Sequence, residues 1–338
     1  MRSEAHELST GATDPGRRGR IHPPLRLIPG SPPRMVRMRV VIAGGTGFLG
    51  RPLVLRLRAA GHDVTTLTRR ADGRSGGREV EWSPSGAVGA WVGELEGLDA
   101  VVNLAGEPLA DRRWTDARKR RLRDSRLDAT RSLVAAMKRA RRPPAAFISG
   151  SAVGYYGPRG LEPIAEAEPS GHDFLGKLAR DWESAALEAH AIGARVVLLR
   201  TGLVLERDGG ALKPLLLPFR LGLGGPFGSG DQYWPWIHRD DWVGAVEWLL
   251  SNPGVAGAVN VTAPTPETNR TFSKTLAAVL RRPCLFRVPA TVLKVTLGEM
   301  SVVVLTGQRA VPSKLSAAGF PFAFSSLEQA LAAILHDE

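Results

Sequence analysis

The stretch from Met38 to Gly50, MRVVIAGGTGFLG, limits the possible folds of this chain more than any other segment. Residues 40–43 are apolar, the first three are β-branched, and the run leads directly into glycine, as expected of a buried strand. Gly44, Gly47 and Gly50 follow with the spacing G-x-x-G-x-x-G, and a helical pattern of Leu and Val begins immediately after them. A strand, a glycine turn and a helix in this order predict the first half of a βαβ unit.

Each glycine of this turn has a separate physical role. Gly44 permits a tight turn, Gly47 lets the backbone approach a pyrophosphate, and Gly50 lets the helix pack closely on the strand. The helix N-terminus offers free N–H groups and the positive end of its dipole to phosphate. We therefore predict a dinucleotide site, the alternative being a plain tight turn between strand and helix. The cofactor-binding residues predicted here are Gly44, Thr46, Gly47, Phe48, Leu49 and Gly50.

Strand and helix patterns continue to alternate along the chain. We predict strands at 62–68, 100–104, 145–149 and 195–199, and long helices at about 115–141 and 174–191. This alternation predicts an α/β fold with a doubly wound parallel (Rossmann) sheet. Beyond residue 207 the alternation weakens, and a small α+β C-terminal cap is expected.

Three regions follow from these patterns. Residues 1–37 combine Pro, Gly, Ser and Arg without periodicity and are expected to be a disordered extension. Residues 38–207 are expected to form the nucleotide domain, with segments near 236–262 as candidates for a return to it. Residues 208–335 are expected to form the cap and the substrate region.

The balance of charges and cysteines narrows the function classes. A formal net charge of +12 suggests nucleic acid, but the basic runs at 118–121 and 138–142 fit solvated helix faces and attraction for an anionic cofactor. No aromatic-and-basic platform or zinc spacing accompanies them, so we expect no nucleic-acid partner. A single cysteine and scattered histidines predict no metal site. No apolar run approaches the roughly 20 residues of a membrane helix, so no membrane partner and a cytoplasmic location are expected.

The end of the second predicted strand distinguishes NAD from NADP. An NAD site usually has Asp or Glu there, to bind the ribose 2′-hydroxyl. Here Thr68 is followed by Arg69 and Arg70, and no acid comes before Asp72. Arginine suits a 2′-phosphate through charge-assisted hydrogen bonds, so NADP(H) is the predicted cofactor. The alternative is two exposed surface arginines.

Two further segments are predicted to contact the cofactor. The strand at 100–104 runs into Leu104, Ala105 and Gly106, whose small residues let the backbone lie against adenine and ribose; a glycine that merely ends a strand is the alternative. Arg126 falls on the apolar face of the helix predicted at 115–141. A buried arginine needs an anionic partner, which is a cofactor phosphate, a substrate carboxylate, or Glu107 or Asp240 in a structural pair.

The motifs GGTGFLG, NLAG, SGSAVGYYG and RTGLVL together resemble an extended short-chain dehydrogenase/reductase of the NAD-dependent epimerase/dehydratase superfamily. The resemblance is closer to an atypical, epimerase-like branch that has a C-terminal domain of unknown function, here at about 285–333. It covers about residues 38–335. Among the stretches that carry it are Arg113-Trp114-Thr115, Ser125-Arg126, Asp181-Trp182-Glu183, Arg200-Thr201-Gly202, Trp236-Ile237-His238 and Gly307-Gln308-Arg309.

The resemblance implies a catalytic pair that this chain lacks. Reductases and epimerases of the superfamily use Tyr-x-x-x-Lys, in which the lysine lowers the tyrosine pKa so that the phenol can exchange a proton beside the nicotinamide. None of the three tyrosines has a lysine four residues later; those positions hold Arg159, Gly160 and Ile237.

By register with the family, Lys177 matches the lysine, Asp173 stands at the tyrosine position and Ser151 matches the catalytic serine. Asp173, Tyr155 or a water chain are the predicted substitutes for the tyrosine. Asp173 has an equally simple alternative as the N-cap of the helix that begins at Phe174.

Two functions are compatible with these residues. The first is an NADP(H)-dependent oxidoreductase or epimerase that acts on an unidentified small molecule. The second is a non-catalytic NADP(H)-binding regulator of the cell-division type, which the resemblance also implies, acting through a protein partner. A homodimer is compatible with either.

Overall fold

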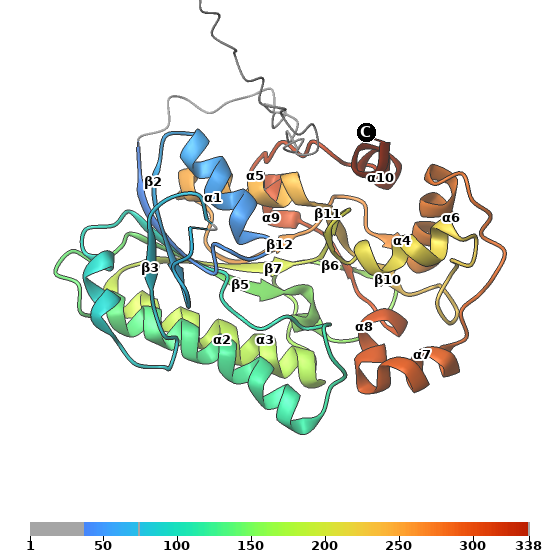
Figure 1. Cartoon of the computed structure of the whole chain (residues 1–338), viewed down its shortest axis with the longest axis horizontal. Coiled ribbons are helices and arrows are strands. Elements are labelled where there is room, and N and C mark those ends of the chain that lie inside the picture. Colours follow the sequence, from blue (N-terminus) through green and yellow to red (C-terminus); the bar gives the residue numbers. More distant parts are fainter. Residues whose placement is uncertain (1–36, 74, 337–338) are drawn as a thin grey trace, which may run out of the picture. The chain divides into compact units, whose positions relative to one another are not determined.

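The computed structural model describes residues 37–73 and 75–336, and the structural statements below refer to these residues (Figure 1). The extension predicted to be disordered lies almost entirely outside them. The described residues belong to one compact unit. No helix in 37–73 or 75–336 combines the length and the apolar character needed to cross a membrane.

A parallel sheet of seven strands forms the centre of this unit and confirms the predicted doubly wound α/β fold. Its order is β12-β7-β5-β4-β1-β2-β3. The chain begins in the middle of the sheet and winds first to one side and then to the other, so the winding reverses between β1 and β4. The strands are β1 (Arg39–Ala43), β2 (Asp63–Thr68), β3 (Glu79–Glu81), β4 (Ala100–Asn103), β5 (Ala146–Ala152), β7 (Arg195–Thr201) and β12 (Gly257–Val261).

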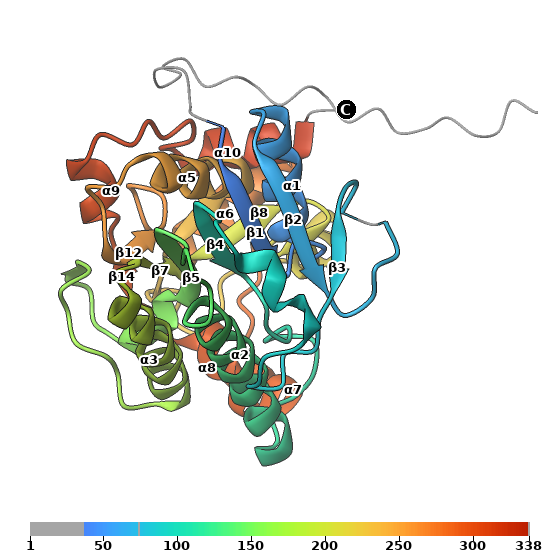
Figure 2. The same cartoon turned by 90° about the vertical axis from the view of Figure 1, so that its left-hand side faces the viewer.

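Helices cover both faces of the sheet (Figures 1 and 2). α1 (Gly50–Ala59) and α5 (Arg239–Ser251) lie on one face and are joined by an Arg56–Glu247 ion pair of 2.8 Å. α2 (Asp116–Met137) and α3 (Phe174–Leu187) lie on the other. Each face has its own apolar cluster, so the central strands are buried on both sides. This burial explains why their sequences read as continuous apolar runs.

Four predicted elements differ by two residues or more from those observed, and one of them is β7, which runs to Thr201 and not only to residue 199. α2 begins after Thr115, whose hydroxyl accepts the Arg118 N–H. It ends at Met137, because the hydrogen bonds of the next turn join residues three apart in the sequence, as in a 3₁₀ helix. α3 ends at Leu187 and continues as the 3₁₀ helix η3 (Glu188–Ile192). β5 runs on to Ala152, because its pairing with β7 continues as far as Thr201. The stretch Gly150–Ala152, expected to follow the strand, is therefore part of it.

Most of the remaining elements form a smaller α+β region with its own core, while Ile164 of β6 and Ala310 of β14 pack in a separate small cluster. The remaining elements include three small sheets, of order β11-β8-β9, β10-β13 and β14-β6. The strands of these sheets are β6 (Pro163–Ile164), β8 (Leu203–Glu206), β9 (Gly209–Gly210), β10 (Tyr233–Trp234), β11 (Trp236–His238), β13 (Glu267–Thr268) and β14 (Arg309–Ala310). The remaining helices are α4 (Lys213–Arg220), α6 (Asn269–Val279), α7 (Ala290–Leu297), α8 (Val302–Leu305), α9 (Ser313–Ala317) and α10 (Leu327–His336). Three further 3₁₀ helices are η1 (Ala90–Leu95), η2 (Val153–Tyr156) and η4 (Gly298–Ser301).

Segments distant in the sequence complete the sheet and its covering layer. β12 pairs with the outer side of β7, although the small sheet of β8, β9 and β11 intervenes in the chain. Leu315 of α9 and Phe320 just after it belong to the apolar cluster of the α1–α5 face. Leu315 and Phe320 therefore help to stabilise the half of the unit that contains the seven-stranded sheet.

Candidate functional site

The glycine turn lies at the carboxyl end of β1, and its geometry explains each glycine. Gly44 has φ +81°, and a Cβ there would lie 2.8 Å from the Leu104 carbonyl group. A Cβ on Gly50 would overlap the carbonyl oxygen of Gly44. A Cβ on Gly47 would meet only that same oxygen, at 3.2 Å. Gly44 and Gly50 are thus required by the fold itself, whereas Gly47 keeps a space in front of α1 clear.

The N-terminus of α1 is available to an anion. Leu49 stands at the N-cap without a side-chain cap hydrogen bond, and the first turn contains no acidic residue. Thr46 is half-buried in the same turn. Phe48 is 38% exposed, and its ring lies against Gly209 and Gly210 of β9. The turn therefore combines an uncapped helix end with a contact to the smaller region.

At the end of β2 the chain turns and presents two arginines. The Thr68 hydroxyl donates to the Arg70 carbonyl oxygen at 3.1 Å and shapes this turn. Arg69 and Arg70 are exposed, and neither guanidinium has an ion-pair partner among residues 37–73 and 75–336. Both charges are consequently free to bind a ligand.

The segment after β4 lies beside the glycine turn. Leu104 N–H donates to the Ala43 carbonyl oxygen at 2.8 Å, and Ala105 N–H donates to Asn103 Oδ1 at 3.2 Å. Gly106 follows, with the Arg126 side chain against its Cα. The structure thus brings Gly44–Gly50, Leu104–Gly106 and Arg126 together at the point where the strand order reverses, the position at which doubly wound sheets bind ligands.

Arg126 has none of the structural partners proposed from the sequence. Glu107 forms an ion pair with Arg118 instead, and the ion pairs of the described chain include none for Arg126. Its guanidinium lies 5.3 Å from the Trp182 ring, and Nη1 donates to the Leu122 carbonyl oxygen at 3.0 Å. Burial, and secondarily the charge of Arg118, lower the Arg126 pKa to about 10, so the group stays charged at neutral pH.

Ser151, matched to the catalytic serine, is buried in a charged network. Its hydroxyl donates to Glu183 Oε1 at 2.6 Å. Arg200 donates to the same carboxylate from Nε and from Nη2, each at 2.9 Å. Arg200 Nη1 also donates to the Tyr156 hydroxyl at 3.0 Å, and that hydroxyl donates to Asn260 Oδ1 at 2.7 Å. The Ser151 hydrogen is therefore held by a carboxylate.

The other predicted catalytic residues are distributed around this network. The Arg200 guanidinium lies 3.4 Å from the centre of the half-buried Tyr155 ring. Asp173 is the N-cap of α3, and its Oδ1 accepts the Gly176 N–H at 3.0 Å, which is the simpler of its two interpretations. Lys177 is exposed, and its ammonium forms no ion pair with a described residue. The structure thus joins Ser151 and Tyr155 through Arg200, and neither Asp173 nor Lys177 is hydrogen-bonded to them.

Comparison with known families agrees with the sheet and the glycine turn. The model of the NAD dependent epimerase/dehydratase family matches residues 40–262, which contain the seven strands of the sheet apart from the first residue of β1. The chain belongs to this family. A second model, described as Domain of unknown function (DUF1731), matches residues 288–334. The chain is therefore a member of the epimerase-like branch that its motifs resemble.

Relatives in this family are similar over nearly their whole length. The epimerase family protein SDR39U1 of Mus musculus is 39% identical over 87% of this chain and 98% of its own. An epimerase family protein of Mycobacterium bovis is 41% identical over 88% of this chain and 97% of its own. The crystal structure of human SDR39U1 (isoform 2) with NADPH superposes with a TM-score of 0.81 at 37% identity, over 89% of this chain and 100% of that one.

A more distant structure, the nucleoside-diphosphate sugar epimerase from Corynebacterium glutamicum, has a TM-score of 0.73 and 31% identity. It is matched over 89% of this chain and 58% of its own length. MoeE5 in complex with UDP-glucose and NAD, at 21% identity and a TM-score of 0.70, shares the fold.

Sequence reasoning missed the roles of Glu183 and Arg200 in this family member. Arg200 ends the apolar run of a central strand, and Glu183 follows a buried Trp on an amphipathic helix. A buried charge in either place needs an opposite charge, so the sequence alone indicates that each of these residues has a partner. Burial lowers the Arg200 pKa, but the hydrogen bonds and charge of Glu183 outweigh it and hold that pKa above its usual value. Which acid meets which base depends on the packing of α3 on β7.

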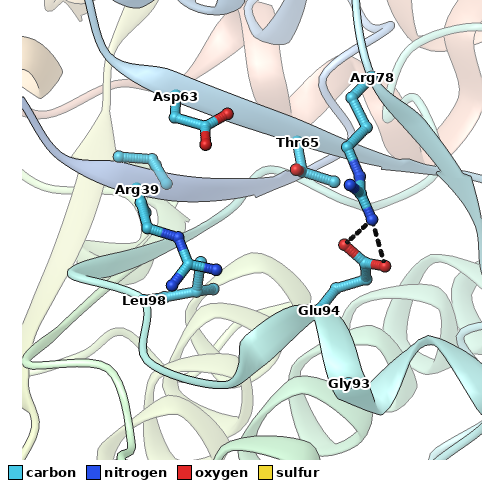
Figure 3. A pocket seen from close by; sticks show the side chains of 8 residues that line it. Arg39, Asp63, Thr65, Arg78, Gly93, Glu94 and Leu98 are labelled. Carbon is cyan, nitrogen blue, oxygen red and sulfur yellow. Dashed lines mark hydrogen bonds and ion pairs between the residues drawn. The ribbon is translucent and has the colours of Figure 1, made fainter.

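A separate pocket opens at the opposite edge of the sheet (Figure 3). Arg39 and Asp63, which line it, begin β1 and β2, whereas the glycine turn follows the end of β1. Arg78 crosses the pocket to Glu94 with contacts of 2.7 and 2.8 Å. Because ligands of doubly wound sheets bind beyond the carboxyl ends of the strands, this pocket is not the nucleotide site.

Proposed function

We propose that this protein binds NADP(H) along the carboxyl edge of β1, β2 and β4. The observation that carries the proposal is the pair of exposed, unpaired arginines, Arg69 and Arg70, at the end of β2, where an NAD site would have a carboxylate. Two guanidinium groups favour the 2′-phosphate of NADP over the bare 2′-hydroxyl of NAD. The NADPH in the human SDR39U1 structure supports the same choice.

The remaining cofactor contacts are assigned to the glycine turn and the segment after β4. The uncapped N-terminus of α1 binds the pyrophosphate, and Gly47 leaves room for it. Leu104, Ala105 and Gly106 lie beside that turn and contact the adenosine half. The cradle fits the cofactor because an added Cβ at Gly47 would project into the space assigned to the pyrophosphate and would approach only the Gly44 carbonyl oxygen, at 3.2 Å.

With NADP(H) bound, the protein is proposed to be an oxidoreductase or epimerase acting on a small molecule. The cofactor supplies or accepts the hydride. The chain's own residues exclude water and supply the proton, and Tyr155, whose ring stacks on Arg200, is the first phenol to test for that role. Asp173 or a water chain are the alternative proton donors. Ser151 is not one of them, because its hydroxyl donates to Glu183.

A second function is favoured by that same engaged serine. Ser151 donates to Glu183 and Asp173 caps α3, so both side chains already have a structural role. A non-catalytic NADP(H)-binding regulator that acts on a protein partner needs no group for proton transfer. This alternative shares the cofactor site and differs only in turnover.

Isothermal titration with NADPH and with NADH tests the cofactor proposal. The wild type is expected to bind NADPH at least about tenfold more tightly, and the double variant Arg69→Gln/Arg70→Gln is expected to bind both with similar affinity. The double variant Arg120→Gln/Arg121→Gln removes the same two charges from exposed positions of α2 and is expected to leave the preference unchanged. Equal affinities in the wild type would refute the proposal.

Loss of NADPH absorbance against a panel of aldehydes, ketones and nucleotide sugars separates enzyme from regulator. Turnover in the wild type that falls about a hundredfold in Tyr155→Phe would support the enzyme and the assigned proton donor. No turnover on any member of the panel, with tight NADPH binding retained, would favour the regulator.

A further inference from the structure

Two arginines of α2, Arg118 and Arg126, lie two turns apart and have opposite surroundings. Arg118 is 5% exposed, and its guanidinium is met by the carboxylates of Glu107 and Asp111 and by the Pro108 carbonyl oxygen. Arg126 is half-buried and meets no carboxylate among the described residues. The chain therefore neutralises one of these charges and leaves the other without a counter-charge.

The surroundings of Arg126 hold its guanidinium in a defined position. Beneath it lies Trp182, whose indole N–H donates to the Thr130 hydroxyl at 2.9 Å; that hydroxyl donates to the Arg126 carbonyl oxygen at 2.8 Å. On another side lies Gly106, where an added Cβ would come within 3.1 Å of the Arg126 side chain. An arginine held in this way loses little freedom when it binds a ligand.

The position of Arg126 is at the carboxyl edge of the sheet. Gly106 follows β4, and Trp182 covers the end of β5, because a Cβ on Gly150 would lie 2.8 Å from its ring. The indole and the guanidinium thus cover the ends of two central strands, next to the strand-order reversal where doubly wound sheets bind their ligands.

We propose that Arg126 binds a carboxylate of the substrate, which makes the substrate an organic acid. This inference rests on the proposed NADP(H) site. In the proposed site the N-terminus of α1 binds two of the three phosphates of NADP(H), and Arg69 and Arg70 bind the third, so the charge of Arg126 is left for the second ligand. Nη1 is engaged by Leu122, while Nε and Nη2 have no hydrogen-bond partner among the described residues. Two adjacent N–H donors on a planar group match the two oxygens of a planar carboxylate.

The test is a titration of the full-length protein saturated with NADPH. The probes are acetate, pyruvate and benzoate, each paired with its neutral amide, and binding is followed by the fluorescence of the bound NADPH and by calorimetry. We expect at least one acid to bind at least about tenfold more tightly than its amide, since a charge-assisted pair is at stake. Arg126→Gln is expected to abolish that difference, Arg126→Lys to keep part of it, and Arg121→Gln to leave it intact.

Affinity for NADPH, measured on the same variants, distinguishes the two possible sources of the anion. The proposal expects the NADPH dissociation constant of Arg126→Gln to stay within about threefold of the wild type, which also shows that the variant is folded. A loss of tenfold or more would assign Arg126 to a cofactor phosphate and overturn the proposal. Wild-type protein that binds NADPH but no acid in preference to its amide would also overturn it. Wild-type protein that binds no NADPH would instead refute the proposed function.

Discussion

At the scale of single residues, Glu183 on α3 and Arg200 on β7 form a buried ion pair. Both side chains are about 5% exposed and meet through two parallel hydrogen bonds. The same carboxylate accepts the Ser151 hydroxyl, and the same guanidinium supports Tyr155 and Tyr156. The pair therefore positions the residues nearest to the proposed chemistry.

Glu183→Gln is expected to destabilise the protein by about 3 kcal/mol, because it leaves the Arg200 charge buried without its counter-charge. Urea unfolding measures this loss. Glu188→Gln provides the matched control: Glu188 follows α3, is 57% exposed and pairs with Lys138 at 3.2 Å. The control is expected to change the free energy of unfolding by less than about 0.5 kcal/mol. Equal losses in the two variants would contradict this account.

Asp241 is expected to make stability depend on pH. It is fully buried on α5, where it accepts the N–H groups of Ala323 and Phe324, and burial raises its pKa to about 6 from an ordinary value of 3.8. Between these values the folded state holds a proton that the unfolded chain has released, so the contribution of Asp241 to stability falls as pH rises from about 4 to about 6. The unfolding free energy of the wild type minus that of Asp241→Asn should therefore fall as pH rises over that interval, because asparagine does not titrate. A difference independent of pH would show that the carboxyl group is not perturbed.

At the scale of elements, the strand–turn–helix unit of β1 and α1 gives the sharpest test. Gly47→Ala adds a methyl group that meets only the Gly44 carbonyl oxygen, at 3.2 Å, so the fold should survive while NADPH affinity falls about tenfold or more. Gly50→Ala places its methyl group on that same oxygen and should reduce both stability and affinity. Gly254→Ala, where a Cβ meets nothing within 4 Å, is the control for both. Thermal melts measure the stability of each variant, and titrations measure its affinity for NADPH. Unchanged NADPH binding in Gly47→Ala would show that the pyrophosphate does not bind at this turn.

On the scale of the whole molecule, the C-terminal residues contribute to two apolar cores. Leu315 and Phe320 belong to the apolar cluster of the sheet, and Leu327, Leu331 and Leu335 to that of the smaller region. At about 2 kcal/mol for each buried side chain, their removal costs about 10 kcal/mol, as much as the entire stability of an ordinary domain.

A chain that ends at Gly307 is therefore expected to show no cooperative thermal transition and no NADPH binding. A chain that ends at His336 keeps these side chains and should melt like the full-length protein. Circular dichroism during heating measures both. A truncated chain with a sharp transition and bound NADPH would show that the C-terminal segment is an independent appendage.

The sequence predicted those parts of the fold that depend on neighbouring residues. Apolar runs bounded by glycine located β1 and β4, and the glycine spacing located the start of α1. Element ends were less accurate, since they depend on pairing with distant strands. β5 extends through Gly150 and Ser151 only because β7 runs beside it, and no local pattern marks that extension.

The sequence by itself determined the α/β class, the glycine turn and the two arginines after β2, because each follows from residues close together in the chain. The absence of Tyr-x-x-x-Lys belongs to the same group. Only the tertiary structure decided the partners of the buried charges: Glu183 for Arg200, and Glu107 for Arg118 rather than for Arg126. A buried charge requires a counter-charge, but its identity depends on how helices pack on the sheet, which residue spacing does not specify. Because that packing leaves Arg126 without a counter-charge among the described residues, Arg126 is the proposed binding site for an acid.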